Sequence, residues 1–272
     1  MLPTFIICGA PKAGTTSLFD YLSQHPDIFC PSCKEPMFFA NNYQKGLSWY
    51  ESLFKKYSNE KEIGEASSWY MRHELAPKRI YSTIPHIKLI FVLRNPIDRA
   101  FSAFWHGKRK GSLQSNLSFS DLIRCHSEIN RIVDTGLYYE QIVRYKQYFS
   151  LEQMHFVLSE ELHKNLSPTL KNVFRFLNVE DSFVPERLEP KNVTSYPRSE
   201  KLYNTFATKL TNLDTYCVSN SYLRPLRSKL FFSKNKSRPQ MNQQDRNFLL
   251  KIYQQDISML SDFLNKDLSL WQ

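Results

Sequence analysis

Three short apolar runs stand out along the chain, and amphipathic stretches separate them. The runs span Phe5–Gly9, Ile87–Leu93 and Met154–Leu158. Continuous apolar runs of this length are typical of parallel strands that are covered on both faces of a sheet. We therefore predict that these three segments are neighbouring strands of a buried parallel sheet.

The segments between the runs have the spacing of apolar residues that favours helices. The predicted helices are Thr16–Gln24, Pro96–Gly107, Tyr138–Phe149, Ser167–Leu177 and a long terminal one, Pro239–Phe263, whereas Asn178–Arg198 is rich in proline and polar residues and is predicted to be irregular. Alternation of strands and helices favours an α/β fold in which helices flank a central parallel sheet. At 272 residues we expect a single domain, residues 1–272, with no repeat and no second domain.

The loop after the first run is the most informative segment. From Gly9 to Leu18 it reads Gly-Ala-Pro-Lys-Ala-Gly-Thr-Thr-Ser-Leu. A strand, a glycine-containing loop and a helix in this order form a cradle for an anion, because backbone N–H groups converge there and the helix dipole adds positive potential. The nucleotide-binding P-loop requires a lysine directly after its second glycine, but Thr15 occupies that position and the lysine lies inside the loop, at Lys12. The loop is thus suited to a phosphate but not to a standard ATP or GTP hydrolase.

Charge adds a preference for anionic ligands. The formal net charge is +10, and the segment from Arg198 to Arg238 carries nine Lys or Arg and two Asp or Glu, hence +7 of that excess. Such a field attracts a nucleotide or an acidic acceptor, although a solvated basic face is an equally plain explanation. No nucleic-acid-binding motif is readable, so we expect no nucleic-acid partner.

Cysteine usage and hydropathy bear on metals and location. Five cysteines do not form a disulfide framework, and the C-x-x-C pair at Cys30 and Cys33 has no second pair at zinc-site spacing. We therefore expect no metal site. No signal peptide and no apolar run of about 20 residues is present, which favours a cytoplasmic protein; the alternative is the luminal catalytic domain of a secretory-pathway enzyme, where the four Asn-x-Ser/Thr sequons would matter.

A second motif follows the strongest predicted strand. Leu93 is followed by Arg94-Asn-Pro-Ile-Asp-Arg-Ala-Phe-Ser102. Arg94 is expected at the carboxyl end of a strand, where open α/β sheets place their ligands, and Ser102 about two turns into the next helix. An arginine fork and a hydroxyl together suit a phosphate. Without the first loop, the simpler interpretation of Arg94 would be a strand-end arginine that forms a salt bridge.

These motifs, with a third, resemble the sulfotransferases that use 3′-phosphoadenosine 5′-phosphosulfate (PAPS). The third motif, Lys34 to Phe39, reads Lys-Glu-Pro-Met-Phe-Phe and is similar to a segment of carbohydrate sulfotransferases of the heparan sulfate type. The resemblance covers nearly the whole chain and is strongest to bacterial PAPS-dependent sulfotransferases. It implies a P-loop nucleotide-kinase-like fold, PAPS as donor and 3′-phosphoadenosine 5′-phosphate (PAP) as product, with no metal.

The resemblance also implies roles for individual residues. Glu35 is the expected catalytic base, and Lys12 the expected cation on the bridging oxygen of the donor. The donor-binding residues are expected to be Lys12, Ala13, Gly14, Thr15, Thr16 and Ser17 at the 5′ end, and Arg94, Ser102 and Arg198 at the 3′-phosphate. The acceptor-binding residues are expected to be Lys34, Phe38, Ser67, Trp69 and Tyr70, although Ala66 and Ser68 replace a lysine and a proline of the family's acceptor-cleft pattern.

The reaction predicted from these residues is in-line transfer of a sulfuryl group to a hydroxyl, or as a less favoured acceptor an amine, of a carbohydrate or glycoconjugate. Polysaccharide, glycolipid, small alcohol and peptide tyrosine all stay open as acceptors, and so does an anionic polymer as partner. The oligomeric state is not readable from the sequence. Two alternative functions are an atypical P-loop nucleotide kinase and a non-catalytic module that binds anionic glycans.

Overall fold

The computed structural model of the chain describes residues 1–114, 116–125, 131–189, 195–209, 211–220, 222–233 and 239–272. The chain separates into two compact units. Unit 1 comprises Met1–Asn95, Tyr138–Asn192 and Ser258–Asp267, and unit 2 comprises Pro96–Leu137, Val193–Ile257 and Leu268–Gln272. The organisation of residues 1–272 as a single domain stays a prediction.

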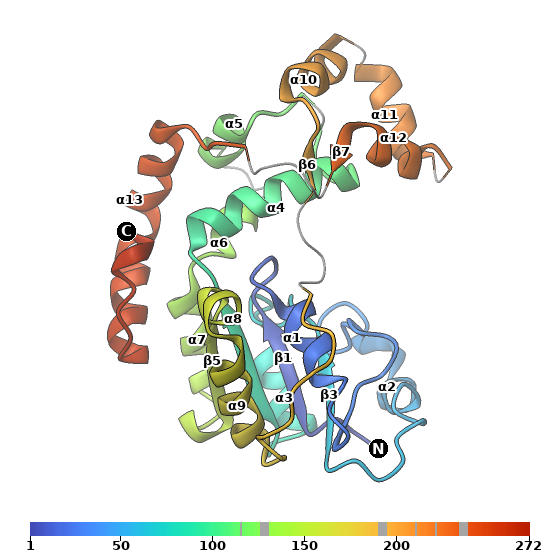
Figure 1. Cartoon of the computed structure of the whole chain (residues 1–272), viewed down its shortest axis with the longest axis vertical. Helices are drawn as coiled ribbons and strands as arrows, with labels where there is room; N and C mark the ends of the chain where they lie inside the picture. The colour runs from blue at the N-terminus through green and yellow to red at the C-terminus, as the bar shows by residue number, and fades with distance from the viewer. Residues whose placement is uncertain (115, 126–130, 190–194, 210, 221, 234–238) are drawn as a thin grey trace. The chain divides into compact units, whose positions relative to one another are not determined.

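A five-stranded parallel sheet forms the centre of unit 1, in the order β2-β3-β1-β4-β5. The strands are β1 (Phe5–Gly9), β2 (Ile28–Phe29), β3 (Glu62–Ala66), β4 (Lys88–Leu93) and β5 (Met154–Leu158), which Figure 1 shows with their helices. The three predicted strands are present, and all are parallel. Their side chains are almost completely buried in β1 and β4, as expected for a sheet that is covered on both faces.

Helices flank this sheet, so the predicted α/β class is confirmed. In unit 1 they are α1 (Thr15–Leu22), α2 (Leu47–Ser52), α3 (Ala76–Thr83), α7 (Tyr138–Lys146), α8 (Ser159–Lys164) and α9 (Leu166–Leu177). The three of these that the apolar spacing predicts are present, with ends within three residues of the expected ones. The hydrophobic pattern is thus a sound guide to the elements that bury a whole face.

The strand β3 is not evident from the pattern, because Glu62-Ile-Gly-Glu-Ala66 contains two glutamates. Both glutamates are nevertheless buried. Glu62 is paired with Lys88 on the nearby strand β4 at 2.6 Å, and Glu65 accepts a hydrogen bond from the Tyr50 hydroxyl. Buried charges are tolerated only with such partners, and the partners come from other elements.

Unit 2 is mainly helical. It contains α4 (Pro96–Lys110), α5 (Phe119–Arg124), α6 (Arg131–Asp134), α10 (Glu200–Lys209), α11 (Thr211–Ser219), α12 (Leu223–Phe231) and most of α13 (Gln243–Leu264), with the short strands β6 (Tyr196–Pro197) and β7 (Phe232–Ser233). The terminal helix α13 begins four residues later than predicted. Asn242 caps it by accepting a hydrogen bond from the Gln244 N–H at 2.8 Å, which is the usual role of an asparagine before a helix.

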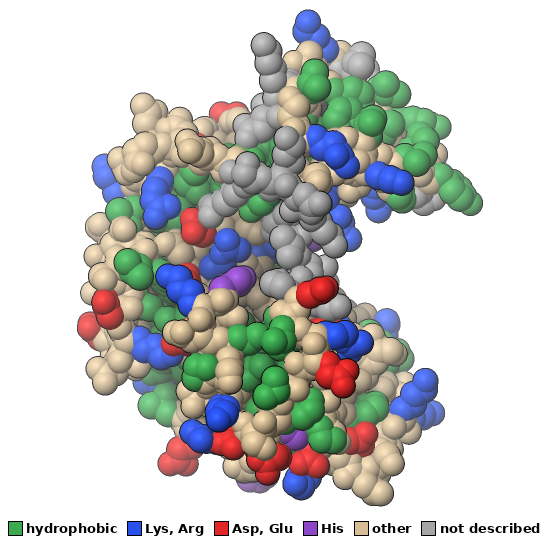
Figure 2. All heavy atoms as spheres, in the orientation of Figure 1, with side chains coloured by type: hydrophobic (Ala, Val, Ile, Leu, Met, Phe, Trp, Pro, Cys, Tyr) green, Lys and Arg blue, Asp and Glu red, His purple; other side chains and the backbone are tan. Residues whose placement is uncertain are grey.

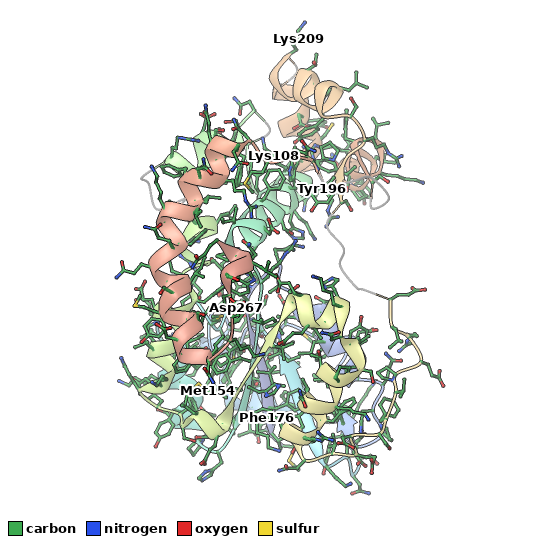
Figure 3. All side chains as sticks on the ribbon, turned by 60° about the vertical axis from the view of Figure 1, so that its left-hand side comes forward. Lys108, Met154, Phe176, Tyr196, Lys209 and Asp267 are labelled. Atoms are coloured by element: carbon green, nitrogen blue, oxygen red, sulfur yellow. The ribbon has the colours of Figure 1, made fainter. Side chains whose placement is uncertain are left out.

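A buried ion pair joins α11 and α12 within unit 2. Arg227 donates two hydrogen bonds to Asp214, and both side chains are almost completely buried. Hydrophobic side chains gather over α10–α12 beside Lys and Arg side chains (Figure 2). Lys108, near the end of α4 (Figure 3), is buried and donates a hydrogen bond to the Gln114 carbonyl.

None of the helices that the structure describes combines the length and apolar composition that a bilayer span requires.

Candidate active site

The site in unit 1 lies where three neighbouring strands end. The strand β1 pairs with β3 on one side and β4 on the other, and all run parallel. Their carboxyl ends therefore lie along one edge of the sheet, which is where open α/β sheets bind ligands. The segments that follow these ends are the glycine-containing loop Gly9–Gly14, the segment Ser67–Tyr70, and Arg94 with Asn95.

The loop curls because two of its residues have left-handed backbone conformations. Lys12 has φ 70° and Gly14 has φ 111°. Such conformations turn successive N–H groups toward the inside of a loop and create an anion-binding concavity. Gly14 is also the residue before α1, whose first turn contains no acidic residue. The helix N-terminus thus adds positive potential that no carboxylate neutralises within this turn.

Arg94 is fixed against this loop. Its Nη1 donates a hydrogen bond to the Lys12 carbonyl at 3.1 Å, and its own carbonyl accepts one from the Tyr138 hydroxyl at 2.9 Å. A guanidinium has five N–H donors, so one bond to the loop leaves most of its capacity for an anion. The two motifs that lie about 80 residues apart in the sequence are therefore in direct contact.

Glu35 belongs to the Lys34–Phe39 segment and contacts Ser68, which follows β3. Its Oε1 accepts hydrogen bonds from Lys34 Nζ at 2.9 Å and from Ser68 Oγ at 3.0 Å. The Glu35 side chain keeps 35% of its surface exposed. A carboxylate that is oriented by two donors and still open to solvent can accept a proton from a bound molecule.

A second carboxyl, Glu65, is completely buried behind this segment. Its Oε1 accepts a hydrogen bond from the Tyr50 hydroxyl at 2.9 Å. Burial raises the pKa of Glu65 to about 7, and the charge of Glu35 adds to the rise. The Ser67 and Tyr70 hydroxyls lie close enough to oppose it, but within the described residues Oε2 has no hydrogen-bond partner.

The predicted acceptor-binding residues fall into two groups. Phe38, Ser67 and Tyr70 are at most 2% exposed, so their side chains are packed inside unit 1. Trp69 is 40% exposed, and the Arg72 guanidinium lies over its ring, 5.9 Å from the centroid. Of these predicted residues, Trp69 and the half-buried Lys34 present surface to solvent.

The predicted 3′-phosphate residues lie in both units. Arg94 belongs to unit 1, whereas Ser102 and Arg198 belong to unit 2. Ser102 is buried in α4, two turns after its start, as predicted. Arg198 is exposed next to β6, and its Nε donates a hydrogen bond to the Lys229 carbonyl at 3.4 Å. Their joint binding of a phosphate stays a prediction.

The comparison with known families settles what kind of protein this is. The sulfotransferase domain family matches residues 2–261. The chain belongs to the sulfotransferase family. It is therefore a member of an enzyme family. A solved sulfotransferase that shares the fold, mouse SULT7A1, was crystallised in complex with PAP.

Solved structures of sulfotransferases share the fold. The crystal structure of a sulfotransferase from Alicyclobacillus acidocaldarius has a TM-score of 0.73 and 28% identity, and the match covers 100% of this chain and 99% of that one. The mouse SULT7A1 structure has a TM-score of 0.51 at 14% identity, over 94% of this chain and 84% of that one. At that identity the mouse structure supports the fold alone.

Curated relatives include two bifunctional heparan sulfate N-deacetylase/N-sulfotransferases. Protein 1 of Caenorhabditis elegans is 30% identical over 98% of this chain, and protein 2 of Homo sapiens is 32% identical over 65% of it. The chain spans 30% and 22% of the lengths of those two proteins.

The sequence interpretation did not anticipate two contacts of the site. It singled out Ser68 only as a departure from the family pattern, yet Ser68 is a direct partner of Glu35. Tyr50 carried no signal at all, because a tyrosine on a short amphipathic helix is most often an ordinary core residue. Among the described residues, no group of three or more His, Cys, Asp and Glu side chains is arranged to hold a metal ion.

Proposed function

We propose that this chain transfers a sulfuryl group from PAPS to a hydroxyl or amine of a sugar, with Glu35 as the base and Lys12 as the principal cation. The observation that carries this proposal is the meeting of three strand ends, which brings the anion loop, Arg94 and Glu35 to one edge of the sheet. The charges fit the donor, because Lys12, Arg94 and a helix N-terminus without a first-turn acid all favour an anion.

The donor, when bound, supplies the sulfuryl group and leaves as PAP. Glu35 accepts the proton of the acceptor as the new bond to sulfur forms. Both described hydrogen bonds to this carboxylate go to Oε1, so Oε2 is the oxygen that meets the acceptor. Lys12 offsets the charge that develops on the bridging oxygen, while Arg94, with Ser102 and Arg198, is proposed to bind the 3′-phosphate.

Trp69 and Lys34 are the proposed acceptor contacts. Trp69 directly follows Ser68 and is exposed, so a sugar ring that stacked on the indole would lie next to Glu35. Phe38, Ser67 and Tyr70 are proposed to shape the segment from inside, because their side chains are buried. The names of the relatives favour an amine on a heparan-type sugar, and the sequence motifs favour a carbohydrate more generally.

Two measurements test the proposal. Isothermal titration should show tight binding of PAP and much weaker binding of ATP; the reverse order would favour a nucleotide kinase. Transfer of labelled sulfate from PAPS is then measured with an N-desulfated glycan, a fully N-acetylated glycan, a glycolipid and a tyrosine peptide. Transfer only to the first glycan assigns an amine acceptor, and transfer to none of them, despite PAP binding, would support a binding module.

We expect Lys12→Ala to lower the transfer rate by at least about 10² to 10³, since one electrostatic contact in a transition state contributes roughly 3–4 kcal/mol. Lys61→Ala is the matched control. It removes the same charge at the amino end of β3, where Lys61 is paired with Asp27. An equal loss in both variants would show that overall charge, not Lys12, is responsible.

A further inference from the structure

The Lys34–Phe39 segment is held by hydrogen bonds from the residues that follow β3. The Ala66 N–H donates to the Lys34 carbonyl at 3.1 Å, and Ser68 Oγ donates to Glu35. In the other direction, the Met37 N–H donates to Ser67 Oγ at 3.0 Å and the Phe39 N–H donates to the Tyr70 hydroxyl at 3.2 Å. The orientation of Glu35 therefore depends on these residues.

Two of those partners are hydroxyls with a proton of their own to donate. Ser67 and Tyr70 accept N–H groups from the segment, and both are buried. The Glu65 carboxyl lies close enough to both to be stabilised by them as an anion. Both hydroxyls thus contact the segment and lie near the Glu65 carboxyl.

Tyr50 extends the same arrangement through its ring. Its hydroxyl donates to Glu65 Oε1, while its ring stacks on Phe38 at 4.4 Å between centroids with an interplanar angle of 8°. Phe39 packs edge-on against the same ring at 5.3 Å. The carboxyl thus anchors the segment through the Tyr50 hydroxyl and the packing of the Tyr50 ring on Phe38 and Phe39.

Glu65 and Glu35 also interact by charge. The negative charge of Glu35 adds to the rise in the pKa of Glu65. Around Glu65, the other titratable groups on the packed elements are Cys8 of β1, Tyr50 of α2, Tyr70 and, beyond Cys8, Tyr145 of α7. Burial raises the pKa of each of these four well above its usual value, so they stay neutral near pH 7.

We propose that Glu65 is a positioning residue, which holds the Lys34–Phe39 segment, and with it Glu35, in place without touching the acceptor. The inference rests on the proposed role of Glu35 as the base. Full burial of Glu65 excludes direct contact with an acceptor, so its effect passes through Tyr50 and the rings of Phe38 and Phe39 that pack on it.

The test uses Glu65→Gln, which keeps the shape of the side chain and removes its charge and titration. The control is Glu62→Gln, at the other end of the same strand, which is also buried and also loses a partner, Lys88. With an acceptor found in the sulfate-transfer screen, we expect Glu65→Gln to lower kcat about tenfold to a hundredfold and to leave the affinity for PAP unchanged. The inflection of the wild-type rate near pH 7 should disappear in Glu65→Gln and persist in Glu62→Gln.

Hydrogen exchange gives a readout that needs no acceptor. Amides of the peptide that spans residues 34–39 should exchange about fivefold faster in Glu65→Gln, the factor that one hydrogen bond contributes on average, and at the wild-type rate in Glu62→Gln. If Glu65→Gln does not fold, Tyr50→Phe retains the stacked ring and should give a smaller effect of the same sign.

Equal exchange rates and equal pH profiles in Glu65→Gln and Glu62→Gln would overturn the inference. Binding of PAP to the wild-type protein, measured by calorimetry in the same series, tests the proposed function separately. A wild-type protein that fails to bind PAP would refute the proposed function, whereas the exchange data would still decide whether Glu65 holds the segment.

Discussion

At the scale of single residues, the site depends on where one lysine lies. Lys12 is inside the loop, with a positive φ, and its carbonyl accepts a hydrogen bond from Arg94. In a standard P-loop the lysine would instead begin the helix, where Thr15 stands here. A left-handed non-glycine residue costs of order 1–3 kcal/mol and is retained where the surrounding structure holds it. Arg94 is one of the groups that hold it.

Glu35→Gln is expected to abolish sulfate transfer and to leave PAP binding almost unchanged. The amide retains the hydrogen-bonding shape of the side chain but cannot accept the proton of an acceptor. Transfer of labelled sulfate and calorimetry with PAP measure the two effects. A variant that kept its activity would require a different base.

Glu65 should also make the stability of the protein depend on pH. Its pKa is about 7 in the folded chain against an ordinary value of 4.5, so the unfolded chain loses this proton first. Glu65 therefore contributes roughly 3 kcal/mol to the free energy of unfolding below about pH 4.5. This contribution is lost as the pH rises to about 7. We expect wild-type Tm, relative to that of Glu65→Gln, to fall across this window in calorimetry; a constant difference would contradict the assignment.

At the scale of elements, a strand could be predicted from the sequence when its side chains are apolar, and not when it contains charged side chains with distant partners. The strands β1, β4 and β5 are apolar, and their pattern was sufficient to predict them. The strand β3 has two glutamates, and their partners Lys88 and Tyr50 come from segments 26 and 15 residues away. A strand that is stabilised by distant polar partners has no local signature, which is why β3 and the hydrogen bonds that follow it were missed.

Gly9, at the end of β1, shows how closely these elements pack. A Cβ at this position would lie 2.7 Å from the Ser68 carbonyl oxygen and 2.8 Å from Met71 Cβ, and φ is 153°. Gly9→Ala should therefore push the loop away from the residue that orients Glu35, destabilise the fold by about 1–3 kcal/mol and lower the transfer rate. Urea unfolding and sulfate transfer measure both effects.

Gly46→Ala is the matched control for this substitution. Gly46 also has a positive φ, 79°, but a Cβ there meets nothing within 4 Å. If both variants lost stability and activity equally, backbone strain rather than the contact with Ser68 would explain the result.

At the scale of the whole molecule, the chain separates into two compact units, and the sulfotransferase family match spans both. Arg94 and the loop lie in unit 1, whereas Ser102, Arg198 and most of the excess positive charge lie in unit 2. Together, the two sets of residues are predicted to bind one donor, which carries a phosphate at both its 3′ and its 5′ end. The net charge of +10 attracts such an anion toward the protein.

The protein's own cations are expected to replace a metal ion in the reaction. The sulfuryl group bears one negative charge fewer than a terminal phosphoryl group, and no Walker-B-type aspartate follows the strand β4, since Arg94 comes directly after Leu93. We therefore expect treatment with EDTA to leave the rate of sulfate transfer unchanged. Loss of activity that magnesium restores would show that this prediction is wrong.

The sequence alone determined the family, the parallel sheet and the residues that bear charge, because each depends on short motifs and on apolar runs that act locally. The tertiary structure decided which of those residues meet: Arg94 with the Lys12 carbonyl, Ser68 with Glu35, and Tyr50 with Glu65. The physical reason is that these contacts join segments that follow or cover different strands, and the order of those strands in the sheet, β2-β3-β1-β4, differs from their order in the chain. No local pattern records that order, because it is set by the packing of the whole sheet.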